Sequence, residues 1–161
     1  MTVLTSEAKV SDQADNTMRL GPYEFAIESA SFQHVTGGEY GPGWDFDFRG
    51  RCVNDDPDEP IFPYGARLYT EVAPMPLDSV DDLTGIALDL PLPYDDDSGE
   101  PLFGLKAWEE HDVSEMKLRF TGRRGRSYRI EITALVAYSI FGHPARLSLA
   151  AWAERLPDRP S

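Results

Sequence analysis

The sequence is short of cysteine, which excludes the disulfide-stapled folds of small secreted proteins. Cys52 is the only cysteine among 161 residues, so no internal disulfide can form. No run of about 18 apolar residues occurs, and the first residues lack a cationic start followed by an apolar stretch. We therefore expect neither a membrane span nor a signal peptide, and a cytoplasmic location.

Positive charge is also scarce, and it is unevenly placed. The chain has 28 acidic and 15 basic side chains, a formal net charge of −13. Residues 1–112 hold 24 acidic and 6 basic side chains, a balance of −18, whereas residues 113–161 hold 4 and 9, a balance of +5. Such a surface repels nucleic acid and membranes of negative charge, and accelerates encounter with a basic protein. A basic protein partner is expected, although the same charge also serves solubility.

Alternation of apolar and polar residues is the main structural signal. It predicts strands at 23–32, 44–52, 68–72, 86–90, 116–120, 128–140 and 145–156. The alternation changes phase near residues 28–31, which predicts a bulge in the first strand. The chemistry of the turns, rich in Gly and Pro, favours an all-β, mainly antiparallel fold, a β-sandwich of about 6–8 strands. A short helix near 105–115 or at the C-terminus is the alternative that the spacing leaves open.

The length fits one domain, which we assign to residues 19–161. Residues 1–18 are polar and lack periodicity, so a flexible N-terminal tail is expected there. The oligomeric state and the order of strands in the sheet do not follow from the pattern.

The clearest hairpin joins the strands at 116–120 and 128–140. Its apolar pattern and Gly125 predict that Leu118 faces Ile130 across a three-residue loop. That register places Arg119 directly opposite Arg129, which is unfavourable without an anion or a carboxylate between them. We therefore expect an anion-binding or charge-pairing hairpin built on Arg119, Arg123, Arg124 and Arg129.

Two acidic loops are candidates for a shared site. If successive strands alternate in direction, the loops at 55–59 and 91–100 lie at one end of the sandwich, and the loop at 78–82 lies beside the arginine hairpin. Clustered carboxylates in sandwich loops resemble in outline the calcium-binding loops of C2-type domains. The ligands of such a calcium site would be Asp55, Asp56, Asp95 and Asp97.

Catalytic and cofactor motifs are missing from the chain. No Gly-x-Ser-x-Gly elbow, nucleotide-binding glycine motif or zinc-ligand spacing occurs, so no cofactor is expected. Cys52 precedes Asp55 and Asp56, and negative neighbours raise the pKa of a thiol and suppress its reactivity. An enzyme of unrecognised type remains the second alternative.

The leading hypothesis is a non-enzymatic, acidic protein-binding module, of the immunity type or another regulatory partner of a basic protein. Aromatic residues in loops rich in proline make good interface anchors, and Tyr64 and Tyr94 are the candidates. The carboxylates that would steer a basic partner toward this surface, the steering charges, are those of Asp55, Asp56, Asp58, Glu59, Asp95, Asp96 and Asp97. The first alternative is a calcium-dependent or carbohydrate-binding sandwich, C2-like or lectin-like.

Overall fold

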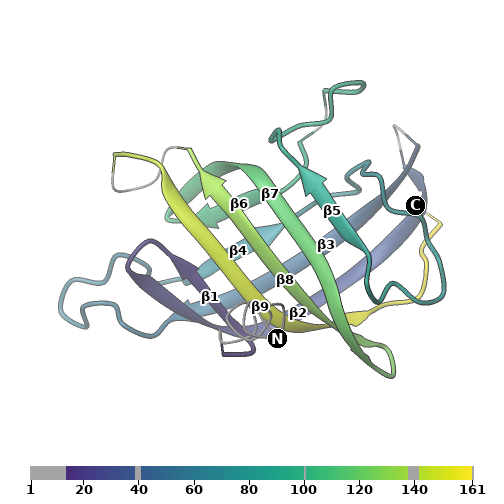
Figure 1. The fold of residues 1–161 in the computed structure, drawn as a ribbon. Helices are drawn as coiled ribbons and strands as arrows, with labels where there is room; N and C mark the ends of the chain where they lie inside the picture. The colour runs from purple at the N-terminus through teal and green to yellow at the C-terminus, as the bar shows by residue number, and fades with distance from the viewer. Residues whose placement is uncertain (1–13, 39–40, 100, 138–141, 161) are drawn as a thin grey trace, which may run out of the picture.

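The computed structural model describes residues 14–38, 41–99, 101–137 and 142–160, which form nine strands (Figure 1). In chain order they are β1 (Thr17–Leu20), β2 (Tyr23–Gly38), β3 (Gly41–Cys52), β4 (Ala66–Tyr69), β5 (Ala87–Leu90), β6 (Gly104–Ala107), β7 (Glu109–Arg124), β8 (Ser127–Val136) and β9 (Ala145–Arg155). Among these residues there is no helix of the length and hydrophobicity that crossing a membrane requires. The all-β, antiparallel prediction is confirmed.

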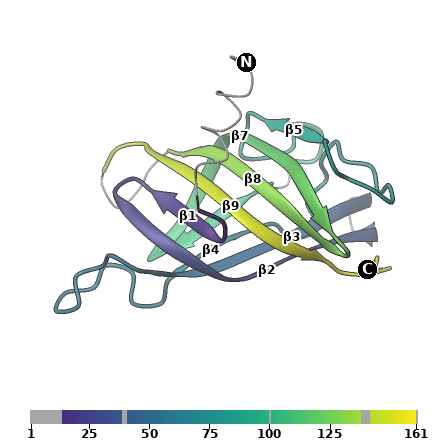
Figure 2. The same cartoon turned by 60° about the horizontal axis from the view of Figure 1, so that its bottom comes forward.

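Eight of the strands close into a barrel, so the predicted sandwich is wrong (Figures 1 and 2). Around the ring, β1 pairs with β2, followed by β3, β4, β6, β7, β8 and β9, and β9 pairs back with β1. Every one of these ladders is antiparallel. β5 lies beside the ring and pairs with the middle of β7.

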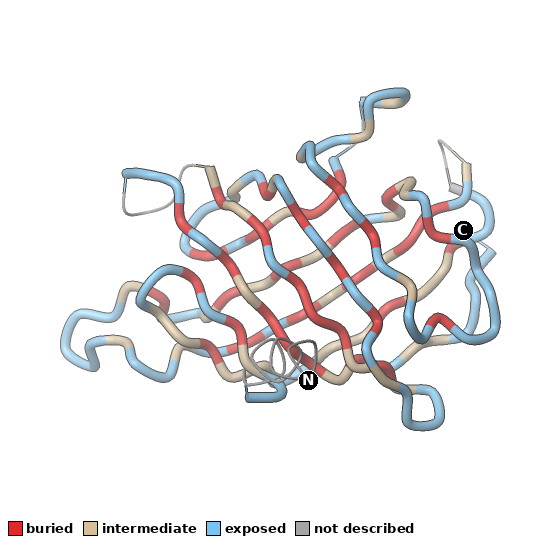
Figure 3. The backbone as a smooth tube through the Cα atoms, viewed as in Figure 1, coloured by how far each residue is buried: buried red, intermediate tan, exposed pale blue. Residues whose placement is uncertain are grey.

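Closure depends on contacts that alternation cannot reveal. Inward apolar and outward polar residues alternate along a strand in a sandwich and in a barrel alike, and Figure 3 shows buried and exposed positions alternating along these strands. A β-bulge bends its strand and increases the local twist, which helps a sheet to curve. The predicted first bulge is confirmed, because the register of β2 against β3 shifts between Ile27 and Ser29.

The interior of the barrel is filled by aromatic side chains. The ring of Phe32 stacks on that of Phe46 at 5.3 Å and lies 5.7 Å from Phe120, and Tyr128 meets Phe120 edge-on at 5.9 Å. Trp44 is buried beside them and donates its indole N–H to the Leu77 carbonyl oxygen. An eight-stranded barrel has an interior that such side chains can fill.

The hairpin of β7 and β8 forms, but its predicted register is wrong by two residues. Leu118 faces Ile132 rather than Ile130, and the turn consists of Gly125 and Arg126. A shift of two residues keeps every side chain on its face, so the apolar pattern fits both registers equally well. A register shift between Phe120 and Gly122 reconciles the ladder with the shorter turn.

The suggested helices are absent, because all of residues 105–115 except Trp108 belong to β6 or β7 and the C-terminal segment forms β9. β1 begins at Thr17, and Met18 is fully buried, so ordered structure starts within the range assigned to the tail. Residues 1–13, and 138–140 at the end of one predicted strand, lie outside the described parts of the chain.

Candidate functional site

A groove on the outer wall of the barrel is the best candidate site. It has a volume of about 560 Å³ and lies over β3, β4 and β6, between the loop that precedes β4 and the connection from β6 to β7. The side chains that give it chemical character are Glu28, Arg49, Tyr64, Arg67, Lys106 and Trp108. We call it the outer-wall groove.

The floor of the outer-wall groove is a row of three cations. Arg49 on β3 faces Arg67 on β4, which in turn faces Lys106 on β6. Directly opposed residues of neighbouring strands point to the same side of the sheet, and like charges in these positions repel. The three cations of the row therefore repel one another.

One carboxylate, Asp47, partly offsets this repulsion. It accepts hydrogen bonds from Nε and Nη2 of both Arg49 and Arg67, at 3.0 to 3.3 Å. Burial raises the pKa of Asp47, but the bonds from Arg49 and Arg67 outweigh burial and leave that pKa below its ordinary value. The hydrogen bond to Asp47 raises the pKa of Arg67, which stays charged. Asp47 and Arg67 therefore form a charged pair within the floor.

Tyr64 stands at one side of the groove on a rigid loop. Its side chain is 97% exposed. The preceding Phe62 is buried and packs edge-on against Tyr23 and Phe25, at 4.9 and 5.1 Å. The following Gly65 has φ = 72°, and a Cβ there would collide with the carbonyl oxygen of Gly50. The loop is thus fixed on both sides of an aromatic ring that faces solvent.

Trp108 stands at the other side and is strained. It is the one residue between β6 and β7, has φ = 67°, and is 65% exposed. A bulky residue with a left-handed backbone costs free energy, and such strain is commonly found at functional sites. An exposed tryptophan is likewise unfavourable in water, so both features favour a role outside folding.

The acidic loops do not meet at one end of the molecule. In Figures 1 and 2, the loop between β3 and β4 and the loop after β5 leave the barrel at widely separated places. The expected convergence fails because β5 pairs beside the ring and β6, not β5, follows β4 around it. Within the described chain, no three His, Cys, Asp or Glu side chains are placed to hold a metal ion. Calcium binding at either loop stays a prediction.

Two of the proposed acidic ligands are used inside their own loops. Asp55 accepts hydrogen bonds from the backbone N–H groups of Ile61 and Phe62, at 2.9 and 2.7 Å, and so shapes the loop that carries Tyr64. Asp95 accepts from the backbone and the hydroxyl of Ser98, and the backbone bond is the main reason that its pKa is lowered.

The remaining candidates of the two loops face solvent. Asp56 accepts a hydrogen bond from the Asp58 backbone, and Tyr94 is 50% exposed. The other exposed carboxylates of these loops are those of Asp58, Glu59, Asp96 and Asp97. The proposed steering charges are therefore accessible, but they belong to two separate surfaces.

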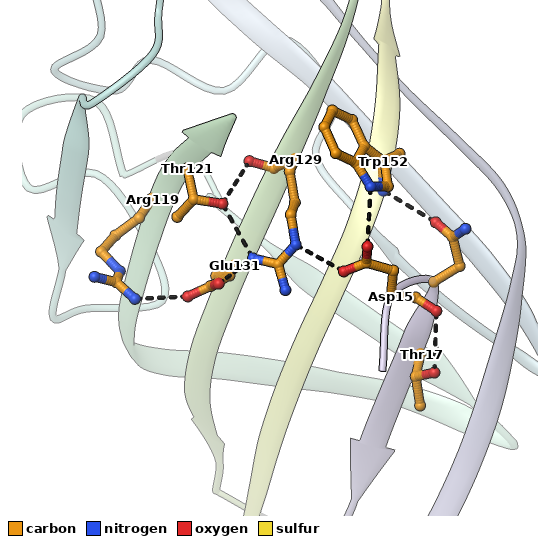
Figure 4. Close-up of polar contacts among 8 residues, drawn as sticks. Asp15, Thr17, Arg119, Thr121, Arg129, Glu131 and Trp152 are labelled. Atoms are coloured by element: carbon orange, nitrogen blue, oxygen red, sulfur yellow. Dashed lines mark hydrogen bonds and ion pairs between the residues drawn. The ribbon is translucent and has the colours of Figure 1, made fainter. Parts of the chain in front are cut away.

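Two arginines of the hairpin are paired with carboxylates of the protein itself (Figure 4). In the observed register Arg119 faces Glu131 and binds it at 2.6 Å, so the expected confrontation with Arg129 does not occur. Arg129 also binds Glu131, and it binds Asp15 at 2.7 Å. Asp15 accepts a further hydrogen bond from the indole of Trp152. These contacts tie the segment before β1 to the outer wall.

The other two candidate arginines, Arg123 and Arg124, also have partners. Arg123 lies 3.7 Å from Asp82, which confirms that the loop at 78–82 lies beside the hairpin. The guanidinium of Arg124 stacks over the ring of Trp152 at 4.2 Å. Charge pairing and stacking therefore account for the basic hairpin.

The environment of Cys52 does not activate it. Burial is the main cause that raises the pKa of its thiol, and the charge of Asp55 raises it further, as the sequence predicted. A thiol with a raised pKa is a poor nucleophile at neutral pH.

Sequence reasoning singled out Tyr64 but missed the cation row and Trp108. The row joins residues that are far apart in the chain, and it emerges only when β3, β4 and β6 are known to be neighbours in register. β6 has four residues and was not predicted. The available signal was Trp108 itself, an aromatic residue followed by the acidic residues Glu109 and Glu110.

Comparison of the chain with protein-family models, with curated proteins and with solved structures found no match.

Proposed function

We propose that the chain is a non-catalytic protein-binding module, of the immunity type or another regulatory kind, and that it recognises a basic protein through the outer-wall groove. One observation carries the proposal. Tyr64 and Trp108, the two large apolar side chains with the greatest exposure in the described chain, line the same groove. Tyrosine and tryptophan are enriched among the residues that dominate binding energy in protein interfaces.

The architecture supports protein binding over a small-molecule function. Aromatic rings fill the barrel interior, where some eight-stranded barrels hold a small ligand. The outer-wall groove is open at the surface, and its aromatic sides are fixed by Gly65, Asp55 and the short β6 to β7 connection. A site that is already ordered loses little conformational entropy when a partner docks.

The charge pattern supports a basic partner. The loop that carries Tyr64 also carries Asp58 and Glu59, and Trp108 is followed by Glu109 and Glu110, all of them exposed. The chain as a whole has a net charge of −13. Together with the exposed carboxylates of these two segments, this charge attracts a basic surface toward the groove and accelerates association. We therefore expect the association rate to fall steeply as salt is raised.

The proposal is tested by capture of partners on the immobilised protein at low salt, followed by measurement with the purified partner. The variant is Tyr64→Ala/Trp108→Ala, and the matched control is Tyr94→Ala, an exposed aromatic residue outside the groove. Loss of two interface anchors should weaken the Kd by at least about 30-fold, because either anchor alone contributes about 2 kcal/mol or more, which corresponds to about 30-fold.

The control should keep the Kd within about threefold, since isolated surface contacts contribute little. The proposal fails if no basic partner binds, or if the double variant and Tyr94→Ala weaken binding equally. Circular dichroism of the variants shows whether a loss of binding is a loss of fold.

Carbohydrate binding is the second candidate, because exposed Tyr64 and Trp108 rings flank a floor of hydrogen-bond donors. It predicts that neutral sugars such as glucose or galactose change the fluorescence of Trp108 in a saturable way. Calcium dependence is tested separately by thermal melting with calcium and with chelator, since a ligand of the folded state raises Tm.

A further inference from the structure

We infer that the row of Arg49, Arg67 and Lys106 is a carboxylate-binding floor, which receives one Asp or Glu side chain of the partner protein. The inference rests on the proposed function and adds the chemistry by which the groove selects its occupant. The partner surface would be basic around a single projecting carboxylate. Its Lys and Arg side chains would meet the acidic segments, and its carboxylate would enter the groove.

The first argument is the uncompensated charge of the floor. Of the charged side chains that line the groove, three are cations and one, Glu28, is an anion. Glu28 already pairs with Arg51 at 3.4 Å, outside the row. Asp47, two residues before Arg49 on β3, pairs with the guanidinium groups of both Arg49 and Arg67. The floor therefore keeps net positive charge in a protein of net charge −13.

Lys106 is the least compensated member of the row. It faces Glu110 across the ladder of β6 and β7, but no ion pair joins them in the described structure. Glu110 instead accepts a hydrogen bond from the Tyr69 hydroxyl at 2.5 Å. Lys106 therefore lies between Arg67 and Glu110 without an ion pair in the described structure, and an incoming anion would add to the partial compensation that Glu110 gives.

The second argument is the supply of positioned donors. Arg49 and Arg67 both use Nε and Nη2 for Asp47, which leaves the Nη1 groups without an acceptor in the described part of the chain. Arg67 is held further by the ring of Tyr69, 4.4 Å below its guanidinium carbon. Guanidinium groups held in place bind carboxylates with strong, directional hydrogen bonds.

The third argument limits the ligand to one anionic group. Charges act over about 8 Å at physiological salt, so the floor attracts an anion only at short range. Beyond that distance the acidic segments and the total charge repel polyanions such as nucleic acid or an acidic tail. A single carboxylate flanked by apolar or basic residues satisfies both conditions, and Tyr64 and Trp108 supply the apolar contacts.

The test uses the whole protein and two probes, acetyl-Phe-Glu-amide and its neutral counterpart acetyl-Phe-Gln-amide. Binding is followed by NMR through the indole N–H signal of Trp108 and the Nε–H signals of the arginines. We expect the Glu probe to shift these signals in a saturable way and to bind at least tenfold more tightly than the Gln probe. Equal binding of the two probes would overturn the inference.

Lys106→Met is the test variant and Lys117→Met the matched control. Both remove one exposed positive charge and keep the aliphatic stem, and Lys117 lies on β7 outside the groove. Lys106→Met should weaken the Glu probe at least fivefold without lowering the melting temperature, whereas Lys117→Met should leave the affinity within twofold. Equal effects of the two variants would show that the floor does not bind the carboxylate.

Two further probes identify the source of the anion. A ten-residue poly-glutamate should bind no more tightly than the Glu probe, and tighter binding would contradict the limit to one group. Glucuronate should not bind more tightly than the Glu probe, and the opposite result would replace the peptide by an acidic sugar.

The two proposals fail in different ways. If the probes behave as expected but the Tyr64→Ala/Trp108→Ala variant binds the partner with unchanged Kd, the proposed function is wrong and the inference of a carboxylate-binding floor is retained. If the double variant loses affinity for the partner but the Glu and Gln probes bind equally, the inference of a carboxylate-binding floor is wrong and the proposed function is retained.

Discussion

Glu131 should be among the most sensitive charged residues in the protein. It is 8% exposed and lies between Arg119 and Arg129, and the side chain of Arg129 is only 12% exposed. Glu131→Gln keeps the size of the side chain but leaves two guanidinium groups without their shared charge. Removal of one partner from a buried pair costs about 3 to 5 kcal/mol, and we expect the lower end, about 3 kcal/mol, because Arg119 is partly solvated.

For a chain of this length, a loss of about 3 kcal/mol corresponds to a fall in Tm of roughly 6 to 12 °C. Urea unfolding followed by tryptophan fluorescence gives the free energy directly. Arg119→Met is the control, since its more exposed ion pair should contribute less than about 1 kcal/mol. If Glu131→Gln lies within about 0.5 kcal/mol of the unchanged protein, the network in Figure 4 does not stabilise the barrel as argued.

Three further perturbations test the groove and its surroundings. Because the pKa of Asp47 is lowered in the folded state, its ionised carboxylate stabilises the fold above about pH 4, and this stabilisation is lost as acid protonates it. Between about pH 5 and 2, the Asp47→Asn variant should therefore lose less stability than the unchanged protein. An equal loss would exclude Asp47 as a source of acid sensitivity. The hydrogen bond to Glu110 raises the pKa of Tyr69 to about 12, so Tyr69→Phe should remove a step near pH 12 from the tyrosinate absorbance titration, and an unchanged curve would refute that bond. Gly65→Ala should destabilise the protein by more than about 1 kcal/mol and disturb Tyr64; stability at the unchanged level would mean that the loop tolerates the added methyl group.

The sequence predicted local structure well and long-range pairing poorly. Alternation located β2 with its bulge and the hairpin of β7 and β8, because each follows from neighbouring residues. The register of that hairpin failed because a slip of two residues preserves both faces. Closure into a barrel failed because β9 pairs with β1 across more than a hundred residues, and no local pattern records such a contact.

The candidate site was predictable only in part for the same reason. Tyr64 follows a proline in a polar loop, and that local context was enough to mark it as an anchor. Arg49 and Arg67 become a site only when β3 and β4 are set side by side in register. Trp108 could be recognised as part of the site only if the connection from β6 to β7 was known. That connection was not predicted, because β6 has only four residues and its pattern also fits a short helix.

The most direct test of the outer-wall groove as the functional site is hydrogen exchange of the protein with and without its captured partner. We predict that protection on binding is concentrated in residues 61–67 and 104–109, the segments that carry Tyr64, Arg67, Lys106 and Trp108. Protection centred instead on residues 91–97 or on the β7 to β8 turn, with the groove unchanged, would contradict the account.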